Sequence, residues 1–266
     1  METSPLVGSP RVLILVDQPL IAEVIELTLN HGVYATRKAK DLAEATAALE
    51  DWHPHLAVVD MDISGDRLIQ RLERSGENGG TRIPTLALTR RGDLRTKLAA
   101  FEQGVDDIMT IPFSPEELLA RVLVIARHSY GQPIPFNPVL RLGEIEIDIM
   151  HRQVRAGTSE VHLTGLEQSL LYLLAARAGQ VVTRDEILDT LWGVDYVSES
   201  NVVDRHVRNL RAKLQNDWHK PRFIATVPGK GYRFIPTFSE SAITGAATTA
   251  QPRAMITRMD YPSPIG

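Results

Sequence analysis

The stretch DDIMTIPFSPEEL, residues 106–118, contains the transition that decides the fold: a short apolar strand, a turn and the start of a helix. Ser114 is a good helix cap, Pro115 suits the first turn, and Glu117 follows the cap by three positions. Four more pairs of an apolar run and a longer helical pattern precede it. The predicted strands are residues 11–16, 33–36, 55–60, 83–88 and 106–110, and the predicted helices are 19–30, 41–50, 66–75, 93–104 and 114–128. This alternation predicts an α/β fold with a doubly wound, five-stranded parallel sheet.

The composition is that of an ordinary globular protein, with 43% hydrophobic and 23% charged residues in 266. Cysteine is absent, which excludes disulfides and cysteine-based metal or thiol sites. The sequence has no apolar run near the roughly 18–20 residues of a membrane span, and its first residues lack the pattern of a signal peptide. We therefore expect a soluble, cytoplasmic protein without a membrane partner.

Charge and proline content divide the chain. Residues 1–128 carry a balance of −5 and residues 139–237 a balance of +1, although the whole chain is at −4. Residues 129–138, SYGQPIPFNP, hold three prolines and no charge, which is typical of a semi-rigid linker. Residues 238–266 are rich in Ser, Ala, Thr, Pro and Gly, and we expect a disordered tail there. The prediction is two domains, 11–128 and 139–237, with different partners.

The second half has another pattern, with short period-two strands, three helices and a final hairpin. Two of its helices open with a capping box, Thr164 with Glu167 and Thr183 with Glu186. The hairpin turns at Pro-Gly-Lys-Gly, residues 228–231. This half is predicted to be a small α+β domain.

Ligands of an open α/β sheet bind beyond the carboxyl ends of its strands. The side chains expected at that edge are Asp17, Asp60, Asp62, Thr89 and Ile111. Carboxylates from different strands could hold a hard cation and a phosphoryl group. A single aspartate there more often caps the next turn, but the set favours a site.

Residues 11–128 resemble the receiver domain of two-component response regulators, through LVDQP, PHLAVVD, LALT and GVDDIMTIPFSPEELLARV. The resemblance implies a flavodoxin-like fold in which Asp60 accepts a phosphoryl group. It also implies that two acidic residues after the first strand organise Mg²⁺, that Thr89 senses the phosphate, and that a lysine at the position of Ile111 binds it.

The chain departs from the receiver pattern at several of these positions. Val16 stands in place of one acidic residue, and Ile111 stands in place of the lysine. Ile108 stands in place of the aromatic switch residue, and Arg90 in place of a small residue. The turn at 64–67 is shorter than in the family pattern. Phosphoryl transfer depends on metal and cation for electrostatic positioning. We therefore expect weak Mg²⁺ binding at Asp17 and Asp60, no tightly held cofactor, and inefficient phosphorylation of Asp60.

Three alternatives stay open for this domain. Arg90 could reach over and replace the lysine, or the chain could be a conventional regulator phosphorylated on Asp60 by a sensor kinase. The Asp60-x-Asp62 pattern also occurs in haloacid-dehalogenase-like phosphatases, but these need a downstream lysine and a further acidic pair. We expect no enzyme activity, and a phosphatase assay with Mg²⁺ would test this.

Helix 200–214 is amphipathic, with one stripe of Val203, Val207, Leu210 and Leu214. The opposite face carries Asn201, Arg205, Arg208, Asn209 and Ala212. Arg and Asn make bidentate contacts to guanine and adenine edges. A solvated charged face is the commoner explanation for a lone helix. The preceding helices and the following basic hairpin favour DNA binding.

Residues 140–237 resemble the winged-helix effector domain of the OmpR/PhoB type, through LTGLEQSLLYLLAARAGQVVTRDEILDTLWG, VVDRHVRNLRAKL and TVPGKGYRF. The resemblance implies that 201–214 enters the major groove of promoter DNA and that 226–233 is the wing. The implied DNA contacts are Asn201, His206, Arg208, Asn209, Arg211, Thr226, Lys230 and Tyr232. Asn209 and Pro228 stand where arginines are common, and Lys230 could partly compensate.

A balance of +1 is small for a DNA binder, so one copy should bind weakly and in a salt-sensitive way. The resemblance implies a homodimer through the fourth helix, fifth strand and fifth helix. We predict Lys97–Glu117 and Asp107–Arg121 pairs between the two copies; ordinary surface salt bridges are the alternative. A protein partner at the receiver could supply the input, as in a stress response. An adaptor with a vestigial DNA domain is the competing class.

Overall fold

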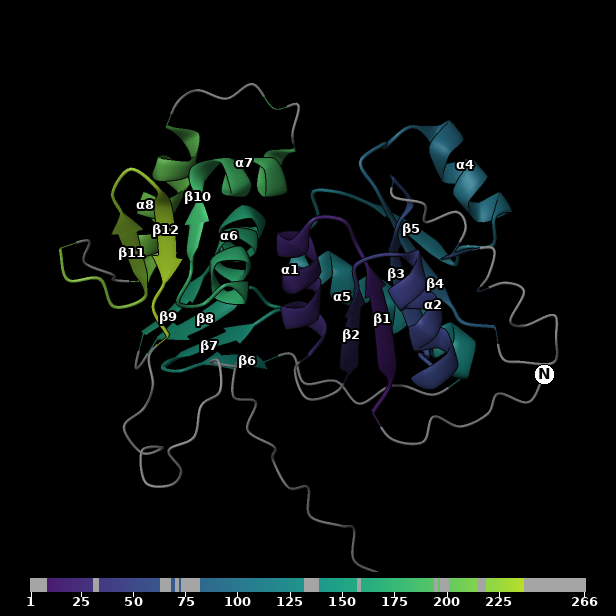
Figure 1. Cartoon of the computed structure of the whole chain (residues 1–266). Helices are drawn as coiled ribbons and strands as arrows, with labels where there is room; N and C mark the ends of the chain where they lie inside the picture. Colours follow the sequence, from purple (N-terminus) through teal and green to yellow (C-terminus); the bar gives the residue numbers. More distant parts are fainter. Residues whose placement is uncertain are drawn as a thin grey trace, which may run out of the picture.

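The structure is a computed structural model that describes residues 9–30, 34–62, 68–69, 72, 82–131, 139–156, 159–193, 196, 201–214 and 219–236. Two halves lie side by side in Figure 1, a parallel sheet with its helices and a smaller domain of helices and short antiparallel strands. Within these described ranges, no helix is both long and apolar enough to span a bilayer.

The N-terminal half is a five-stranded sheet in the order β2-β1-β3-β4-β5, with every neighbouring pair parallel. Its strands are β1 Arg11–Leu15, β2 Ala35–Ala39, β3 Leu56–Asp60, β4 Thr85–Thr89 and β5 Asp107–Thr110. Its helices are α1 Pro19–Leu29, α2 Leu42–Asp51, α4 Leu94–Glu102 and α5 Pro115–Tyr130. The predicted doubly wound fold is confirmed. The strand order reverses at β1 and β3, which is where sheets of this type form their sites.

Alternate residues of each central strand enter cores on opposite faces of the sheet, as a period of two requires. Val12 and Ile14 pack with α1 and α5, whereas Leu13 and Leu15 pack with apolar residues of α2 and α4. The two receiver departures Val16 and Ile111 belong to the α1 and α5 side, where they are 5% and 8% exposed. Both are therefore structural core residues.

The second strand was predicted too early, at 33–36. The strand is Ala35–Ala39, and it lies at the edge of the sheet. Polar side chains are tolerated on an edge strand. Arg37 pairs with Asp51 at 2.7 Å and Lys38 with Glu26 at 2.6 Å, so these side chains attach the strand to α2 and α1. The apolar pattern that guided the prediction missed this polar strand.

The prediction of a helix at 66–75 falls mostly outside the described residues, although Leu68, Ile69 and Leu72 are helical and buried. The fifth helix is longer than predicted and takes the first two residues of the expected linker 129–138. It ends at Gly131, whose φ of 66° suits glycine. Tyr130 anchors this last turn, since its hydroxyl donates to the His55 carbonyl at 2.5 Å.

The C-terminal half begins with a four-stranded antiparallel sheet, β6 Val139–Leu142, β7 Ile145–Asp148, β8 Gln153–Ala156 and β9 Ser159–His162. Helices α6 Gly165–Ala176, α7 Arg184–Trp192 and α8 Val202–Lys213 follow, with a second sheet of β10 Val181–Thr183, β12 Gly231–Phe234 and β11 Ile224–Val227. Both predicted capping boxes are formed. This is a winged-helix arrangement, as predicted.

The wing depends on one glycine. A Cβ on Gly231 would lie 2.1 Å from the Val182 carbonyl oxygen, so only glycine lets β12 pass β10. The tail predicted at 238–266 lies outside the described residues.

Candidate phosphoacceptor pocket and nucleic-acid interface

Asp60, Asp62 and Arg90 form a compact charged cluster at the carboxyl end of β3. Asp60 is fully buried, and its Oδ1 accepts a hydrogen bond from the Asp62 amide at 3.0 Å. Its Oδ2 accepts from Arg90 Nη1 at 3.3 Å. The same Nη1 lies 3.5 Å from Asp62 Oδ2, which also accepts from the Arg90 amide at 3.0 Å. One arginine thus joins both carboxylates.

Burial dominates the titration of Asp60. Desolvation raises the pKa of Asp60 above its ordinary value, while the Asp62 amide and the Arg90 guanidinium lower it only in part. The carboxylate therefore needs a cation beside it, and Arg90 supplies that cation from within the chain. A contact of Arg90 with this pocket was one of the alternatives left open above, and the structure brings Arg90 and Asp60 together.

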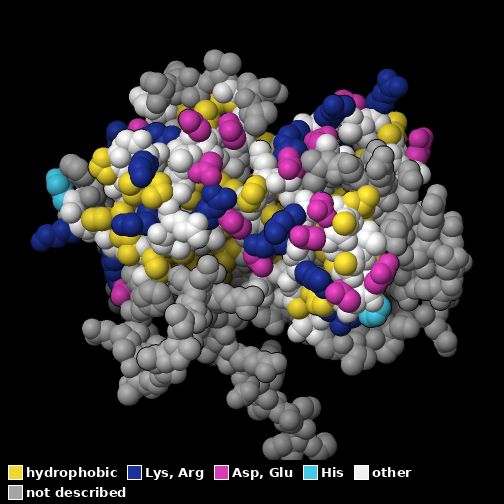
Figure 2. Space-filling model, viewed as in Figure 1, with side chains coloured by type: hydrophobic (Ala, Val, Ile, Leu, Met, Phe, Trp, Pro, Cys, Tyr) yellow, Lys and Arg dark blue, Asp and Glu magenta, His cyan; other side chains and the backbone are white. Residues whose placement is uncertain are grey.

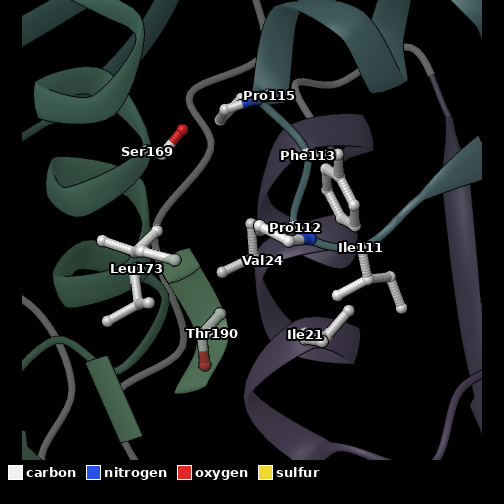
Figure 3. A pocket seen from close by; sticks show the side chains of 10 residues that line it. Ile21, Val24, Ile111, Pro112, Phe113, Pro115, Ser169, Leu173 and Thr190 are labelled. Carbon is white, nitrogen blue, oxygen red and sulfur yellow. The ribbon is translucent and has the colours of Figure 1, made fainter. Parts of the chain in front are cut away.

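The other predicted pocket residues are arranged differently. Thr89 is buried, and its hydroxyl accepts from the Arg91 amide at 3.0 Å. Asp17 is exposed after β1. Ile111 lies beside Ile21 of α1 (Figure 3), in the apolar core between the sheet and that helix. The Ile111 side chain is thus part of an apolar layer.

A receiver would need Mg²⁺ at this edge, and the donor set fits that ion poorly. Magnesium requires several oxygen ligands in near-octahedral order. Here a guanidinium already contacts the Oδ2 atoms of Asp60 and Asp62, and Val16 is buried where a second acid would sit. Among the residues whose placement is described, no group of three or more His, Asp or Glu could hold a metal. A weak site at Asp17 and Asp60 stays a prediction.

Helix α8 presents the face that its periodicity predicts. Val203, Val207, Leu210 and Leu214 are all buried under it. The side chains that remain exposed on the opposite face are Asn201, Arg205, Arg208, Asn209 and Ala212. Cationic and amide donors are therefore free to meet an anionic, base-bearing partner.

Two of the predicted DNA contacts, Arg211 and Tyr232, connect the helix to the wing within the chain. Arg211 donates through Nη2 to the Ile224 carbonyl and to Thr226 Oγ1, both at 2.9 Å. Its guanidinium carbon lies 5.4 Å from the centre of the Tyr232 ring, within cation–π range. Tyr232 is 4% exposed and Arg211 is partly buried, which lowers the pKa of Arg211. Both residues hold β11 and β12 against α8.

Asp204 completes this connection, together with Arg184 at the start of α7. Asp204 Oδ1 accepts from Arg184 Nε at 2.8 Å and from the Tyr232 hydroxyl. Burial alone would raise the pKa of Asp204, but the hydrogen bonds from Tyr232 and Arg184 outweigh it and lower the pKa. We name Arg184, Asp204, Arg211 and Tyr232 the helix–wing network. Sequence analysis missed Arg184 and Asp204, because no periodicity brings positions 20 residues apart together.

The remaining predicted contacts are divided between surface and interior. Thr226 and Lys230 are exposed on the wing. His206 is half-buried with its ring 5.4 Å from that of Trp192, and burial, reinforced by Arg205, lowers the pKa of His206. Trp192 packs against the core, as expected.

Three of the four predicted dimer residues, Asp107, Glu117 and Arg121, form pairs within one chain. Arg121 Nη1 donates to Asp107 Oδ2 at 2.7 Å, and Nη2 donates to Glu117 Oε1 at 2.8 Å. Strand β5 and helix α5 place the Asp107 and Arg121 side chains together within one chain, and the Asp107–Arg121 and Lys97–Glu117 pairs between copies stay predictions. On neighbouring α4, which carries Lys97, the apolar side chains Leu94, Leu98 and Phe101 are exposed.

The chain resembles known proteins over both halves. Residues 12–123 match the family described as Response regulator receiver domain, and residues 158–234 match Transcriptional regulatory protein, C terminal. A probable transcriptional regulator ycf27 from Porphyridium aerugineum is 34% identical over 84% of this chain and 95% of its own. The dual master transcriptional regulator RpaA of Synechocystis is 32% identical over 84% and 94%.

Among solved structures, the response regulator DrrB of Thermotoga maritima, an OmpR/PhoB homologue, has 26% identity and a TM-score of 0.41. The match covers 86% of this chain and 100% of that one.

Proposed function

This chain belongs to the OmpR/PhoB-type two-component response regulators, which are DNA-binding transcriptional regulators, and we propose that it acts without efficient phosphorylation of Asp60. The Arg90 bridge between Asp60 and Asp62 is the observation that supports this proposal most strongly. A phosphoryl donor must approach Asp60 Oδ2 with a divalent metal, and both would have to displace the guanidinium. Losing one charge-assisted contact costs about 1.5–3 kcal/mol, so the displacement opposes transfer.

The burial of Ile111 supports the same conclusion. A lysine ammonium would stabilise charge on the phosphoryl oxygens, whereas the isoleucine side chain faces Ile21 and offers no donor. Catalysis of phosphoryl transfer rests on such electrostatic contacts. The receiver has thus kept its fold, while an apolar side chain stands in place of the lysine and Arg90 contacts the carboxylates that a metal would need.

The test is intact-mass spectrometry after incubation with Mg²⁺ and acetyl phosphate, with Asp60→Ala as control and a receiver with a complete site run in parallel. We expect an adduct on the parallel receiver and none on this chain. A stable adduct that disappears in Asp60→Ala would make the chain a conventional, kinase-driven regulator.

Arg90→Ala separates two roles of the arginine. If Arg90 blocks the site, the variant should gain labelling at high Mg²⁺. If Arg90 replaces the missing lysine, any labelling of the wild type should be lost in the variant. Arg91→Ala is the matched control, because Arg91 is the exposed neighbour on the same loop.

For promoter DNA, the proposal assigns base contacts to the exposed face of α8 and backbone contacts to the wing. Arg205, Arg208 and Asn209 would enter the major groove, with Lys230 and Thr226 beside it. A homodimer through the receiver would bring two such helices to adjacent half-sites. A protein partner that binds the receiver, or a change in the amount of this protein, would replace the sensor kinase as the input signal. The protein would act in the cytoplasm, where it meets promoter DNA.

The biological role that we propose is more specific than membership of the family. Among members with an atypical receiver, the sequence resembles the non-bleaching response regulator of cyanobacteria, which would imply control of phycobilisome breakdown under nutrient stress. Deleting the gene in its host and following phycobilisome absorbance during nitrogen starvation tests the role: retained pigment supports it, and normal bleaching contradicts it.

A further inference from the structure

Helix α8 divides its polar side chains into a group held by the domain and a group that remains exposed. The held group comprises Asp204, His206, Arg211 and Lys213. Two of its members belong to the helix–wing network. The His206 ring lies 5.4 Å from that of Trp192, and Lys213 Nζ donates to Glu167 Oε2 at 2.6 Å. The domain's own contacts therefore already engage these side chains.

The exposed side chains of α8 lie in a regular order. Arg205, Asn209 and Ala212 are spaced by four and then three positions, which places them on one face of the helix. Arg208 is beside Asn209, and all four residues are exposed. Lys and Arg side chains predominate over Asp and Glu on the part of the surface that the wing and α8 form, at the left of Figure 2. This face suits an anionic partner.

The spacing along this face matches the stacking of base pairs. Residues four apart in a helix are separated by about 6 Å along its axis, and residues three apart by about 4.5 Å. Successive base pairs of a duplex are about 3.4 Å apart. In a helix that lies along the major groove, Arg205 and Asn209 therefore reach base pairs about two steps apart. Ala212 reaches the pair next to that of Asn209.

The chemistry of these side chains selects different bases. An arginine makes a bidentate contact to O6 and N7 of guanine, an asparagine to N6 and N7 of adenine, and an alanine methyl contacts the methyl group of thymine. Asn209 stands where an arginine is common, as noted above. An arginine at this position would select guanine, whereas the amide of Asn209 selects adenine.

The wing offers little that could read a base sequence. Pro228 and Lys230 are exposed at its tip. Proline has no donor on its side chain, and a lysine contacts phosphate as a point charge. The Thr226 hydroxyl already accepts from Arg211 at 2.9 Å. The reading of sequence therefore rests on the exposed face of α8.

We propose that Asn209 and Ala212 determine the DNA sequence that this chain selects, with Asn209 reading an adenine and Ala212 the methyl group of a neighbouring thymine. The ligand is duplex DNA whose half-site combines these A·T pairs with guanines read by Arg205 and Arg208. This assignment rests on the proposed function, because it requires α8 to enter the major groove.

The test is selection of binding sites from a randomised duplex by the full chain, followed by sequencing. The wild type should enrich an adenine that Asn209→Arg replaces by guanine and that Asn209→Ala leaves free to vary. In competition binding, the wild type should prefer the adenine duplex to the guanine duplex on the order of 5- to 150-fold, and Asn209→Arg should reverse the preference. Lys230→Ala is the control, because loss of a phosphate contact weakens both duplexes equally.

The contact of Ala212 is tested by replacing the neighbouring thymine with uracil, which lacks only the methyl group. The wild type should bind about fourfold more weakly to the uracil duplex, the effect of burying one such group, and Ala212→Gly should bind both duplexes equally. Thermal melts confirm that each variant is folded.

Two results would count against the assignment in different ways. If the wild type and Asn209→Arg enrich the same half-site, the assignment of adenine to Asn209 is overturned while DNA binding stands. If the wild type enriches no sequence at all, the proposed function fails and the assignment fails with it.

Discussion

The acidic cluster at Asp60 and the helix–wing network are both built around arginines, but they hold their charges in opposite ways. At Asp60 the arginine turns inward, and its contacts with two carboxylates use the groups that would otherwise receive metal and phosphate. In the C-terminal domain the inward pairs of Arg184 and Arg211 are structural, and other cations on α8 remain exposed. An ion pair can thus remove a function at one site and support it at another, depending on which charges it leaves free.

The largest effect should come from a free charge, Arg208. Arg208→Ala removes an exposed guanidinium from the proposed DNA-facing side of α8, and loss of a bidentate base contact costs about 1–3 kcal/mol, roughly 5- to 150-fold in affinity. Fluorescence anisotropy with a selected duplex at fixed salt measures it. Arg155→Ala controls for charge, because Arg155 is exposed on β8 and pairs with Glu146. Equal losses in both variants would favour an adaptor whose DNA domain is vestigial.

Disruption of the helix–wing network should lower the free energy of unfolding. Asp204→Ala leaves the Tyr232 hydroxyl and Arg184 without their shared acceptor. We expect a loss of about 1 kcal/mol in the free energy of unfolding, since 38% of the Asp204 side chain is exposed and solvent replaces part of the contact. Urea unfolding measures this loss, and Arg208→Ala should leave the free energy unchanged. A stable Asp204→Ala variant would mean that packing alone holds the wing.

The sequence predicted the features that arise from local pattern. Alternating apolar runs gave the five-stranded sheet, and the capping residues Thr164 and Thr183 marked two helix starts that the structure confirms. The edge strand Ala35–Ala39 was missed in part because its polar residues are stabilised by ion pairs with other elements. Local pattern cannot predict contacts of that kind.

The candidate sites were predicted by position and only partly by contact. Asp60, Asp62 and Thr89 lie at the expected edge, yet the direction of the Arg90 side chain and the inward turn of Arg211 depend on tertiary packing. Arg177 Nε donates to Glu23 Oε2 at 2.6 Å, and the two residues are 154 positions apart in different domains, so nothing in either local sequence indicates their contact.

A smaller change in stability should show whether burial or the Arg90 pair dominates at Asp60. The raised pKa of Asp60 means that the folded state binds a proton more readily than the unfolded state. The ionised group therefore lowers stability at neutral pH, and this penalty disappears as pH falls through the folded pKa toward 3.8. Asp60→Asn should stabilise the chain at pH 7 by roughly a few tenths of a kcal/mol, because relief of desolvation is offset by the lost Arg90 pair.

The pH dependence is the decisive part of that measurement. The stability gap between Asp60→Asn and wild type should narrow as the buffer is acidified, in thermal melts from pH 7 down to pH 4. Asp17→Asn controls for the loss of one charge at the same edge, from an exposed position. A gap that widens on acidification would mean that Arg90 stabilises the carboxylate more than burial opposes it.

The smallest expected effect is the coupling energy of the surface pair of Arg121 with Asp107. Its dependence on protein concentration shows whether the pair forms within one chain or between two chains. A double-mutant cycle on Asp107→Ala and Arg121→Ala should give a coupling energy of about 0.5 kcal/mol, since both side chains are about a third exposed. An intrachain pair contributes the same coupling at every protein concentration, because its two members are already joined by β5 and α5. A pair between copies contributes only where the dimer forms. Unfolding measured at two protein concentrations, one below and one above the onset of dimerisation seen by light scattering, distinguishes the two kinds of pair. A coupling energy that is the same at both concentrations supports the intrachain pair. A coupling energy that appears only where the dimer forms supports the pair between copies.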